Sequence, residues 1–348
     1  MDDTIRGTFR RFVVTILISL VMYFVQFVVH YYAENGAFPS FSRLMSQNPR
    51  GEGYTTHEEE ILGNVVRPES IKERLDDIGG LKSVKEDIRA QVLVPLKHPD
   101  VFFGEIASLH PPRGVLFYGP PGTGKTMLAR AIAAEAGCPF VALSLSSLEN
   151  KWFGETSKLL GATFSLARKL QPCVLFFDEI DGMIRTRGDN DMSAVYGFKT
   201  EFLSHMDGIQ TNQQDAFIVI ACTNCEKSLD PAIRRRLPQK YKIDYPDRNE
   251  LKSILNVHLK NSGLKQKAID AFAETIRDGA TGSDIHELVK ATWASQRKKM
   301  MMSEKFVEKL ASGMVDADTI ARKTGRMRLK SLMHTASERG LLSVSVSG

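Results

Sequence analysis

A glycine-rich loop between two apolar segments constrains this chain of 348 residues more than any other feature. Residues Gly119 to Thr126, GPPGTGKT, fit the pattern G-x-x-x-x-G-K-[ST]. Residues 114–118 before the loop predict a buried strand, and residues 125–136 after it predict a helix that Gly137 ends. A strand, a glycine loop and a helix in this order direct backbone N–H groups and the positive helix end at a phosphate. The loop therefore predicts a nucleotide site on an α/β fold.

The loop also predicts roles for its side chains. Lys125 is expected to reach the β- and γ-phosphates, and the Thr126 hydroxyl is expected to hold Mg²⁺. The bound nucleotide would be ATP or GTP. The residues expected to contact it here are Gly119, Pro120, Pro121, Gly122, Thr123, Gly124, Lys125, Thr126 and Met127.

An apolar segment near the start of the chain predicts a membrane anchor. Residues 12–32 contain no charged side chain, and as a helix they would cover the roughly 30 Å of a bilayer core. A secretory signal peptide is the main alternative, because three arginines precede the segment within the tail 1–11. The apolar run is too long for a signal peptide, and no small-x-small cleavage site follows it. We expect one N-terminal transmembrane helix.

The charges around the predicted anchor conflict with its expected orientation. The arginines before it favour a cytosolic N-terminus, which would place the nucleotide domain on the other side of the membrane. Arg43 and Arg50 on the far side weaken that bias, and a nucleotide-consuming domain needs cytosolic ATP. We expect the nucleotide domain to face the cytosol.

The cysteines and the net charge argue against a zinc site and a nucleic-acid partner. Cys222 and Cys225 form a C-x-x-C pair, but no second Cys or His pair stands at a spacing that would complete a zinc site. Together with Cys138 and Cys173 they are expected to be reduced thiols. The net charge of +5 comes from interspersed acidic and basic residues, so no nucleic-acid partner is expected.

The rest of the chain divides by its pattern. We expect a linker with one short helix over 33–70, a large α/β subdomain over 71–246, a small helical subdomain over 247–313, and a C-terminal helix and tail over 314–348. Alternating strands and helices in the large part predict a parallel sheet covered by helices on both faces. The predicted strands are 114–118, 139–145, 173–178, 217–222 and 240–244. The predicted helices are 125–136, 155–170, 194–206, 248–262, 266–278, 283–299 and 303–312.

Polar residues at the ends of two predicted strands indicate hydrolysis. Asp178 ends an apolar strand and would hold Mg²⁺, and Glu179 would act as general base on the attacking water. Asn224 follows the next strand and could orient the same water, although an Asn there is also common turn chemistry. Arg235 and Arg236 could meet the charge that develops on the γ-phosphate, or could lie on a solvated basic turn.

Residues from about 77 to 292 resemble the AAA ATPase module of the meiotic clade, which includes katanin, spastin and the ESCRT-disassembling ATPase. Residues 77–81 (DIGGL), 119–126, 177–181, Asn224, Arg235-Arg236 and 282–284 (GSD) match in order and spacing. The resemblance implies a hexameric ring that hydrolyses ATP with Mg²⁺, with Arg235 and Arg236 acting on the neighbouring subunit's nucleotide. It also places Asp77, Ile78, Gly79, Gly282 and Ser283 around the nucleotide base and sensor region.

Two adjacent aromatics precede the second predicted helix. Trp152 and Phe153, beside Lys151 and Gly154, are costly to expose to water, and packing into the core is one explanation for them. The AAA resemblance implies another: this segment is pore loop 1, which grips a threaded polypeptide. A second pore loop would lie over 185–196.

One anchor followed by one AAA module resembles the mitochondrial sorting AAA ATPase family, the transmembrane helix translocases of the outer mitochondrial membrane and peroxisomes. This implies a homohexamer that extracts mislocalised tail-anchored proteins through its pore. The chain departs from the family by Cys222 within the sensor strand and by Lys240, where Arg is common.

Other functions fit the sequence less well. A membrane-bound AAA protease needs H-E-x-x-H, and the segments that begin at His57 and His286 both lack the second His. A cytoskeletal remodeller such as a microtubule-severing enzyme needs a targeting domain that the short linker cannot hold, and an ESCRT-type remodeller remains an alternative. Glu179 and the arginine pair argue against a non-hydrolysing ATP-binding scaffold.

Overall fold

The computed structural model describes residues 53–102, 110–144, 156–184, 192–211, 215–302 and 327–343. All of them belong to one compact unit, Glu52–Gly348. The predicted anchor 12–32, the pore-loop residues 151–154, residues 185–191 of the second predicted pore loop and the predicted helix 303–312 lie outside the described residues. Within the described ranges, no helix is both long and apolar enough to cross a bilayer.

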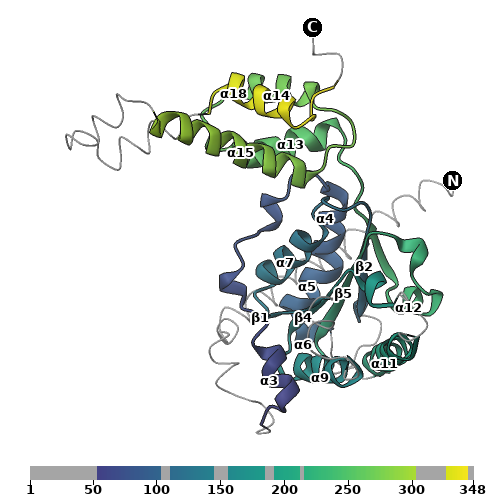
Figure 1. The fold of residues 1–348 in the computed structure, drawn as a ribbon. Helices are drawn as coiled ribbons and strands as arrows, with labels where there is room; N and C mark the ends of the chain where they lie inside the picture. The colour runs from purple at the N-terminus through teal and green to yellow at the C-terminus, as the bar shows by residue number, and fades with distance from the viewer. Residues whose placement is uncertain are drawn as a thin grey trace, which may run out of the picture. The chain divides into compact units, whose positions relative to one another are not determined.

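The described strands form one six-stranded sheet in the order β1-β3-β4-β5-β2-β6 (Figure 1). They are β1 (Val65–Val66), β2 (Gly114–Tyr118), β3 (Phe140–Ser144), β4 (Cys173–Asp178), β5 (Phe217–Thr223) and β6 (Gln239–Lys242). The five strands from β2 to β6 confirm the predicted strands, and each is parallel to its neighbours among them. The prediction of an entirely parallel sheet is wrong at one edge, because β1 pairs antiparallel with β3.

The missed strand belongs to a segment that was predicted as linker. Helix α3 (Thr56–Leu62) precedes β1, and Thr55 begins the helix with a reciprocal capping box to Glu58. The α3 helix packs on α9 (Thr156–Lys169). Helix α3 is the short helix expected within 33–70. Because α3 packs on α9 and β1 pairs with β3, residues 55–66 are part of the folded body. Two valines carry too short a pattern to predict a strand, and only pairing with β3 makes them one.

Each face of the sheet is covered by helices (Figure 1). On one face, strand residues such as Val115 and Phe176 share a buried cluster with Leu128. The helices and turns of that face are α7 (Lys125–Ala136), α4 (Lys82–Ile88), α5 (Val94–Lys97) and α6 (Pro99–Phe102). On the other face, the Phe177 ring lies 6.0 Å from Phe164 of α9 and 5.3 Å from Phe202 of α11 (Met192–Thr211). Burial on both faces explains why the strands are almost continuously apolar.

A second hydrophobic cluster joins the helices that follow the sheet in sequence. These helices are α13 (Arg248–Leu259), α14 (Gln266–Thr275), α15 (Gly282–Met301) and α18 (Leu329–Glu338). The first three confirm the predicted helices 248–262, 266–278 and 283–299. The α18 helix packs on α15. After α18, Leu342 forms an antiparallel β-bridge with Ile276. This part of the predicted C-terminal helix and tail therefore belongs to the helical cluster.

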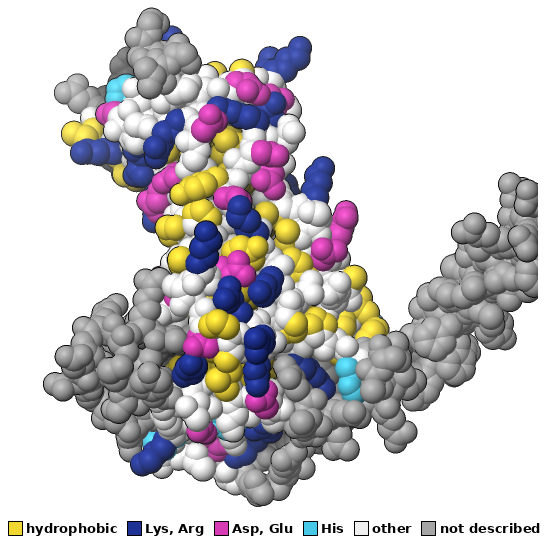
Figure 2. Space-filling model, turned by 90° about the vertical axis from the view of Figure 1, so that its right-hand side faces the viewer, with side chains coloured by type: hydrophobic (Ala, Val, Ile, Leu, Met, Phe, Trp, Pro, Cys, Tyr) yellow, Lys and Arg dark blue, Asp and Glu magenta, His cyan; other side chains and the backbone are white. Residues whose placement is uncertain are grey.

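Charged side chains are mixed on the face drawn in Figure 2. Lys and Arg are interspersed there with Asp and Glu and with hydrophobic side chains. The positive net charge is therefore not gathered into one patch on that face.

Candidate nucleotide-binding site

The glycine loop leaves β2 through a constriction that excludes any side chain. Gly119 has φ of 145°, and a Cβ there would lie 2.0 Å from the carbonyl oxygen of Ile243, at the end of the neighbouring strand. Gly124, with φ of 98°, precedes the first residue of α7. These backbone conformations favour glycine, so the loop takes this path because of the residues that define its motif.

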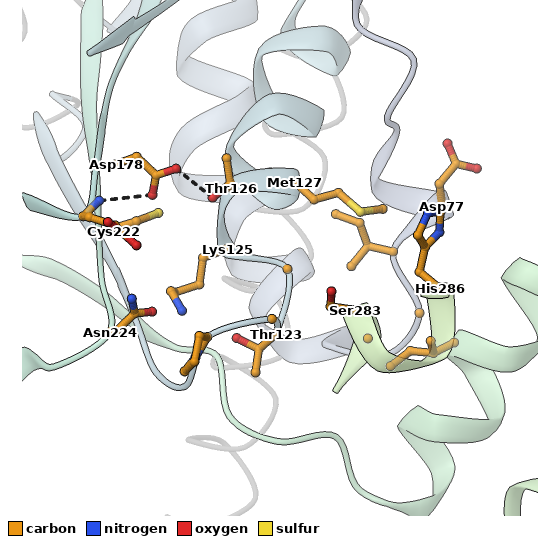
Figure 3. Close-up of a pocket in the computed structure, with 18 of the residues that line it drawn as sticks. Asp77, Thr123, Lys125, Thr126, Met127, Asp178, Cys222, Asn224, Ser283 and His286 are labelled. Atoms are coloured by element: carbon orange, nitrogen blue, oxygen red, sulfur yellow. Dashed lines mark hydrogen bonds between the residues drawn. The ribbon is translucent and has the colours of Figure 1, made fainter. Parts of the chain in front are cut away.

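The loop forms one wall of a cavity of about 480 Å³, within the size range of small-ligand sites (Figure 3). The predicted site residues that line it are Asp77, Ile78, Gly79, Pro121, Gly122, Thr123, Gly124, Lys125, Thr126, Met127, Asp178, Glu179, Asn224, Gly282 and Ser283. Residues more than 200 positions apart in sequence thus meet around one space.

Lys125 is held at the loop end of the cavity. Its ammonium group donates to the carbonyl oxygens of Gly119 at 2.8 Å and Pro120 at 2.7 Å. The side chain is buried, and burial lowers the pKa of its ammonium group, while neighbours that include Asp178 and Glu179 counteract the shift. Gly119 and Pro120 therefore position the lysine. From this position the Lys125 ammonium group could exchange its two carbonyl partners for a phosphate.

The predicted magnesium ligands lie in contact. The Thr126 hydroxyl donates to Oδ2 of Asp178 at 3.1 Å, and Oδ1 of Asp178 accepts from the backbone N–H of Glu179 at 3.1 Å. Strands β2 and β4 are parallel and lie on either side of β5, so their carboxyl ends reach the same sheet edge. A hydroxyl and a carboxylate at this separation fit a shared Mg²⁺ between loop and strand.

Glu179 and Asn224 complete the polar end of the cavity. Glu179 is exposed, has φ of 50°, and follows directly after β4. Asn224 follows β5 and reaches the cavity beside Lys125 in Figure 3. The carboxylate can accept a proton from a water molecule, and the amide on the adjacent strand end can orient the same water.

The far end of the cavity is built by the start of α15. The backbone N–H of Ser283 donates to the carbonyl oxygen of Gly122 at 3.1 Å, which joins the helix start directly to the glycine loop. Asp284 accepts from both the backbone N–H and the hydroxyl of Thr281, at 2.8 and 2.9 Å. These bonds explain why residues 281–284 form a compact helix start there.

Sequence reasoning missed several residues that line the cavity: Cys222, Thr223, Ile254, His258 and His286. The rings of His258 and His286 lie 5.3 Å apart. Burial lowers the pKa of His258, and His286 adds to the effect. Ile254 and His258 are four residues apart on α13, which indicates one shared helix face. Which face meets the nucleotide loop depends on how α13 packs, and no local pattern contains that information.

The two arginines do not line this cavity. Arg236 makes a bidentate pair with Asp207 of α11, at 2.8 and 2.9 Å. Arg235 is exposed at the end of α12 (Pro231–Arg236). Arg235 is therefore not among the residues that line the cavity of its own chain.

Comparison with known proteins agrees with this geometry. The profile of the ATPase family associated with various cellular activities (AAA) matches residues 115–245. The chain is 40% identical to the outer mitochondrial transmembrane helix translocase of Homo sapiens over 236 residues, which cover 67% of this chain and 64% of that protein. It is 34% identical to the mitochondrial sorting homolog of Caenorhabditis elegans, with 73% of each chain covered. The solved FIGL-1 AAA domain in complex with ADP shares 28% identity at a TM-score of 0.64, and the match covers 84% of this chain and 94% of that domain.

The chain therefore belongs to the AAA family of ATPases. Among its AAA relatives are proteins named outer mitochondrial transmembrane helix translocase, which confirms the resemblance seen in the sequence motifs. The chain spans 64% of the length of these relatives, just under two thirds.

Proposed function

We propose that this chain hydrolyses ATP and uses the energy to extract tail-anchored proteins from the outer mitochondrial membrane. The observation that carries the proposal is the meeting of Lys125, Thr126, Asp178, Glu179 and Asn224 around one cavity. A site for binding alone would not need Glu179 next to Asp178. Family membership supports ATP and Mg²⁺ as the cofactors.

Each side chain at the phosphate end of the cavity has its own role in hydrolysis. Thr126 and Asp178 would hold Mg²⁺, which would supply positive charge to the phosphates. Lys125 leaves its two carbonyl partners and binds the β- and γ-phosphates. Glu179 accepts the proton of the attacking water, which Asn224 orients. Arg235 meets the charge on the γ-phosphate from the adjacent subunit of a homohexamer.

Glu179→Gln tests the hydrolysis step. The amide cannot accept the proton of the water, so we expect the turnover of ATP to fall at least about a hundredfold while ATP binding is retained. Turnover is measured as phosphate release, and binding by calorimetry. Glu274→Gln, an exposed carboxylate on α14, is the matched control and should hydrolyse as the wild type does. Equal turnover in Glu179→Gln would contradict the general-base role.

The substrate part of the proposal rests on the relatives' names and on the sequence. Relatives named for translocating transmembrane helices support membrane-protein extraction. Residues 12–32 would anchor the chain in the bilayer with its AAA domain facing the cytosol, in the outer mitochondrial membrane and in peroxisomes. Lys151, Trp152, Phe153 and Gly154 would grip the substrate in the pore of the hexamer, and no nucleic acid would take part.

Reconstitution tests the extraction. The full chain is placed in liposomes with a tail-anchored protein, ATP is added, and the substrate is followed from the membrane to the soluble fraction. We expect ATP-dependent release, and we expect Trp152→Ala to retain most ATPase activity but lose release, because a smaller side chain grips poorly. Retained release by Trp152→Ala would favour the core-packing explanation. If wild-type substrate stays in the membrane while ATP turns over, a cytoskeletal or ESCRT-type remodeller is favoured instead.

A further inference from the structure

The segment 77–81 approaches α13 closely at its two glycines, Gly79 and Gly80. A Cβ on Gly79 would lie 2.4 Å from the backbone N and Cα of Ile254. A Cβ on Gly80, which has φ of 74°, would lie 2.8 Å from Cγ of Glu250. Contacts below 3 Å with backbone atoms are prohibitive, so glycine is needed for this close approach.

One carboxylate joins the two elements at this contact. Oε1 of Glu250 accepts from the backbone N–H of Leu81 at 2.8 Å, across 169 positions of sequence. Oε2 of the same group accepts from the backbone N–H of Asp247 at 3.2 Å, and Asp247 accepts in return from the backbone N–H of Glu250. Glu250 therefore caps the start of α13 and holds the end of the glycine segment at once.

Both joined elements contribute to the same end of the cavity. The glycine segment supplies Asp77, Ile78 and Gly79, and α13 supplies Ile254 and His258. Glu250, Ile254 and His258 are spaced four residues apart, so they follow one face of the helix. Because the glycine loop takes the phosphates, this other end is the place left for the nucleoside.

We infer that Glu250 is a positioning residue for the nucleoside, since its carboxylate holds the two walls of that end of the cavity at a set separation. The inference rests on the proposed nucleotide binding. Without the carboxylate, Leu81 loses its partner and the two walls are free to separate. The affinity for nucleotide then falls, while the catalytic groups at the phosphate end keep their places.

The test compares Glu250→Ala, Glu250→Gln and Glu274→Ala with the wild-type full chain. We expect Glu250→Ala to raise the Kd for ADP, measured by calorimetry, about tenfold, the effect of one hydrogen bond to a charged acceptor. Glu250→Gln keeps an amide oxygen for Leu81 and should lose less than about threefold. Glu274→Ala removes a carboxylate that pairs instead with Lys252 of α13 and should bind as the wild type does. The turnover of ATP at saturation should stay within about twofold in all three.

Several outcomes would overturn the inference. One is an unchanged Kd for ADP in Glu250→Ala. Another is a Kd for ADP in Glu250→Gln as high as that in Glu250→Ala. A third is a loss of saturated ATP turnover in Glu250→Ala as large as its loss of affinity, which would indicate general disruption of the site. A wild-type chain that binds ADP but does not hydrolyse ATP would contradict the proposed hydrolysis and leave the Kd comparison intact. A wild-type chain that binds no ADP would overturn both.

Discussion

At the scale of single residues, hydrogen bonds to a few neighbouring groups fix the side chains of the site. Lys125 rests on two carbonyl oxygens of its own loop, and Asp178 is held between Thr126 and the backbone of Glu179. His258 differs from these, because burial and its neighbour His286 oppose its charged form. Its protonation should therefore affect the folded state measurably.

The pH dependence of stability tests His258. Its pKa in the folded chain lies below the ordinary value of about 6.5. Below that pH the unfolded chain binds a proton that the folded chain resists, so the free energy of unfolding falls as the solution is acidified. One such group contributes at most about 1.4 kcal/mol per pH unit.

The variant His258→Gln removes this contribution. Chemical denaturation is carried out at about pH 7 and about pH 5.5, on either side of the ordinary pKa of histidine. The free energy of unfolding should fall less on acidification in the variant than in the wild type. Identical losses in both proteins would mean that His258 does not carry this pH dependence.

At the scale of elements, α3 is joined to α9 by a buried ion pair. The carboxylate of Glu58 is 2% exposed and accepts from the Lys169 ammonium group at 2.8 Å and from the Ser165 hydroxyl at 2.7 Å. Burial pushes the pKa of Glu58 up, but the hydrogen bonds from Lys169, Thr55 and Ser165 outweigh it, and the net pKa is lowered. Glu58 is therefore ionised in the folded chain and depends on its partners.

Lys169→Met tests this attachment. It leaves a buried carboxylate without its cation, which typically costs about 3–5 kcal/mol, so we expect a loss of that order in the free energy of unfolding, measured by urea denaturation. Lys290→Met is the control, because Lys290 and Glu287 form an exposed pair at 3.5 Å, which contributes less than about 1 kcal/mol. Similar losses in the two variants would show that the buried pair does not secure α3.

At the scale of the whole molecule, the arginine pair separates into two environments. Arg236 is engaged with Asp207 of its own chain, whereas Arg235 is exposed and outside the chain's own cavity. In the proposed hexamer, Arg235 would reach the nucleotide of the neighbouring subunit. The hydrolytic unit would then be a pair of neighbouring subunits.

Mixing variants tests this division. Arg235→Ala alone should lower the ATPase activity of the assembly at least about tenfold, because the γ-phosphate loses a cation in the transition state. An Arg235→Ala subunit retains Glu179, and a Glu179→Gln neighbour retains Arg235, so some mixed pairs contain one complete site. We expect the mixture to exceed the summed activities of the two variants measured apart. A mixture no more active than that sum would place Arg235 outside the neighbouring site.

Much of the fold and of the phosphate end of the site could be predicted from local patterns. The loop at Gly119 to Thr126, the strand that ends in Asp178 and the helices from residue 248 onward follow from glycine placement, apolar runs and helical spacing within short windows. Parallel strands with polar ends already imply that Lys125, Asp178 and Asn224 meet, because their carboxyl ends share one edge.

Contacts between distant segments could not be read in this way. The β1 strand exists because Val65 pairs with Val141, and α3 is attached because Glu58 meets Lys169. The nucleoside end depends on His286, on Ile254 and on the bond from Leu81 to Glu250. In each case an ordinary residue gains its role from a partner far away in sequence.

The sequence by itself determined that this chain has a strand–loop–helix phosphate site with acidic strand ends, since backbone conformation and hydrophobic periodicity are local properties. Only the tertiary structure decided which face of α13 closes the cavity, where the sheet ends and which arginine is already paired. Those features depend on packing and long-range hydrogen bonds, whose partners are chosen by the fold as a whole.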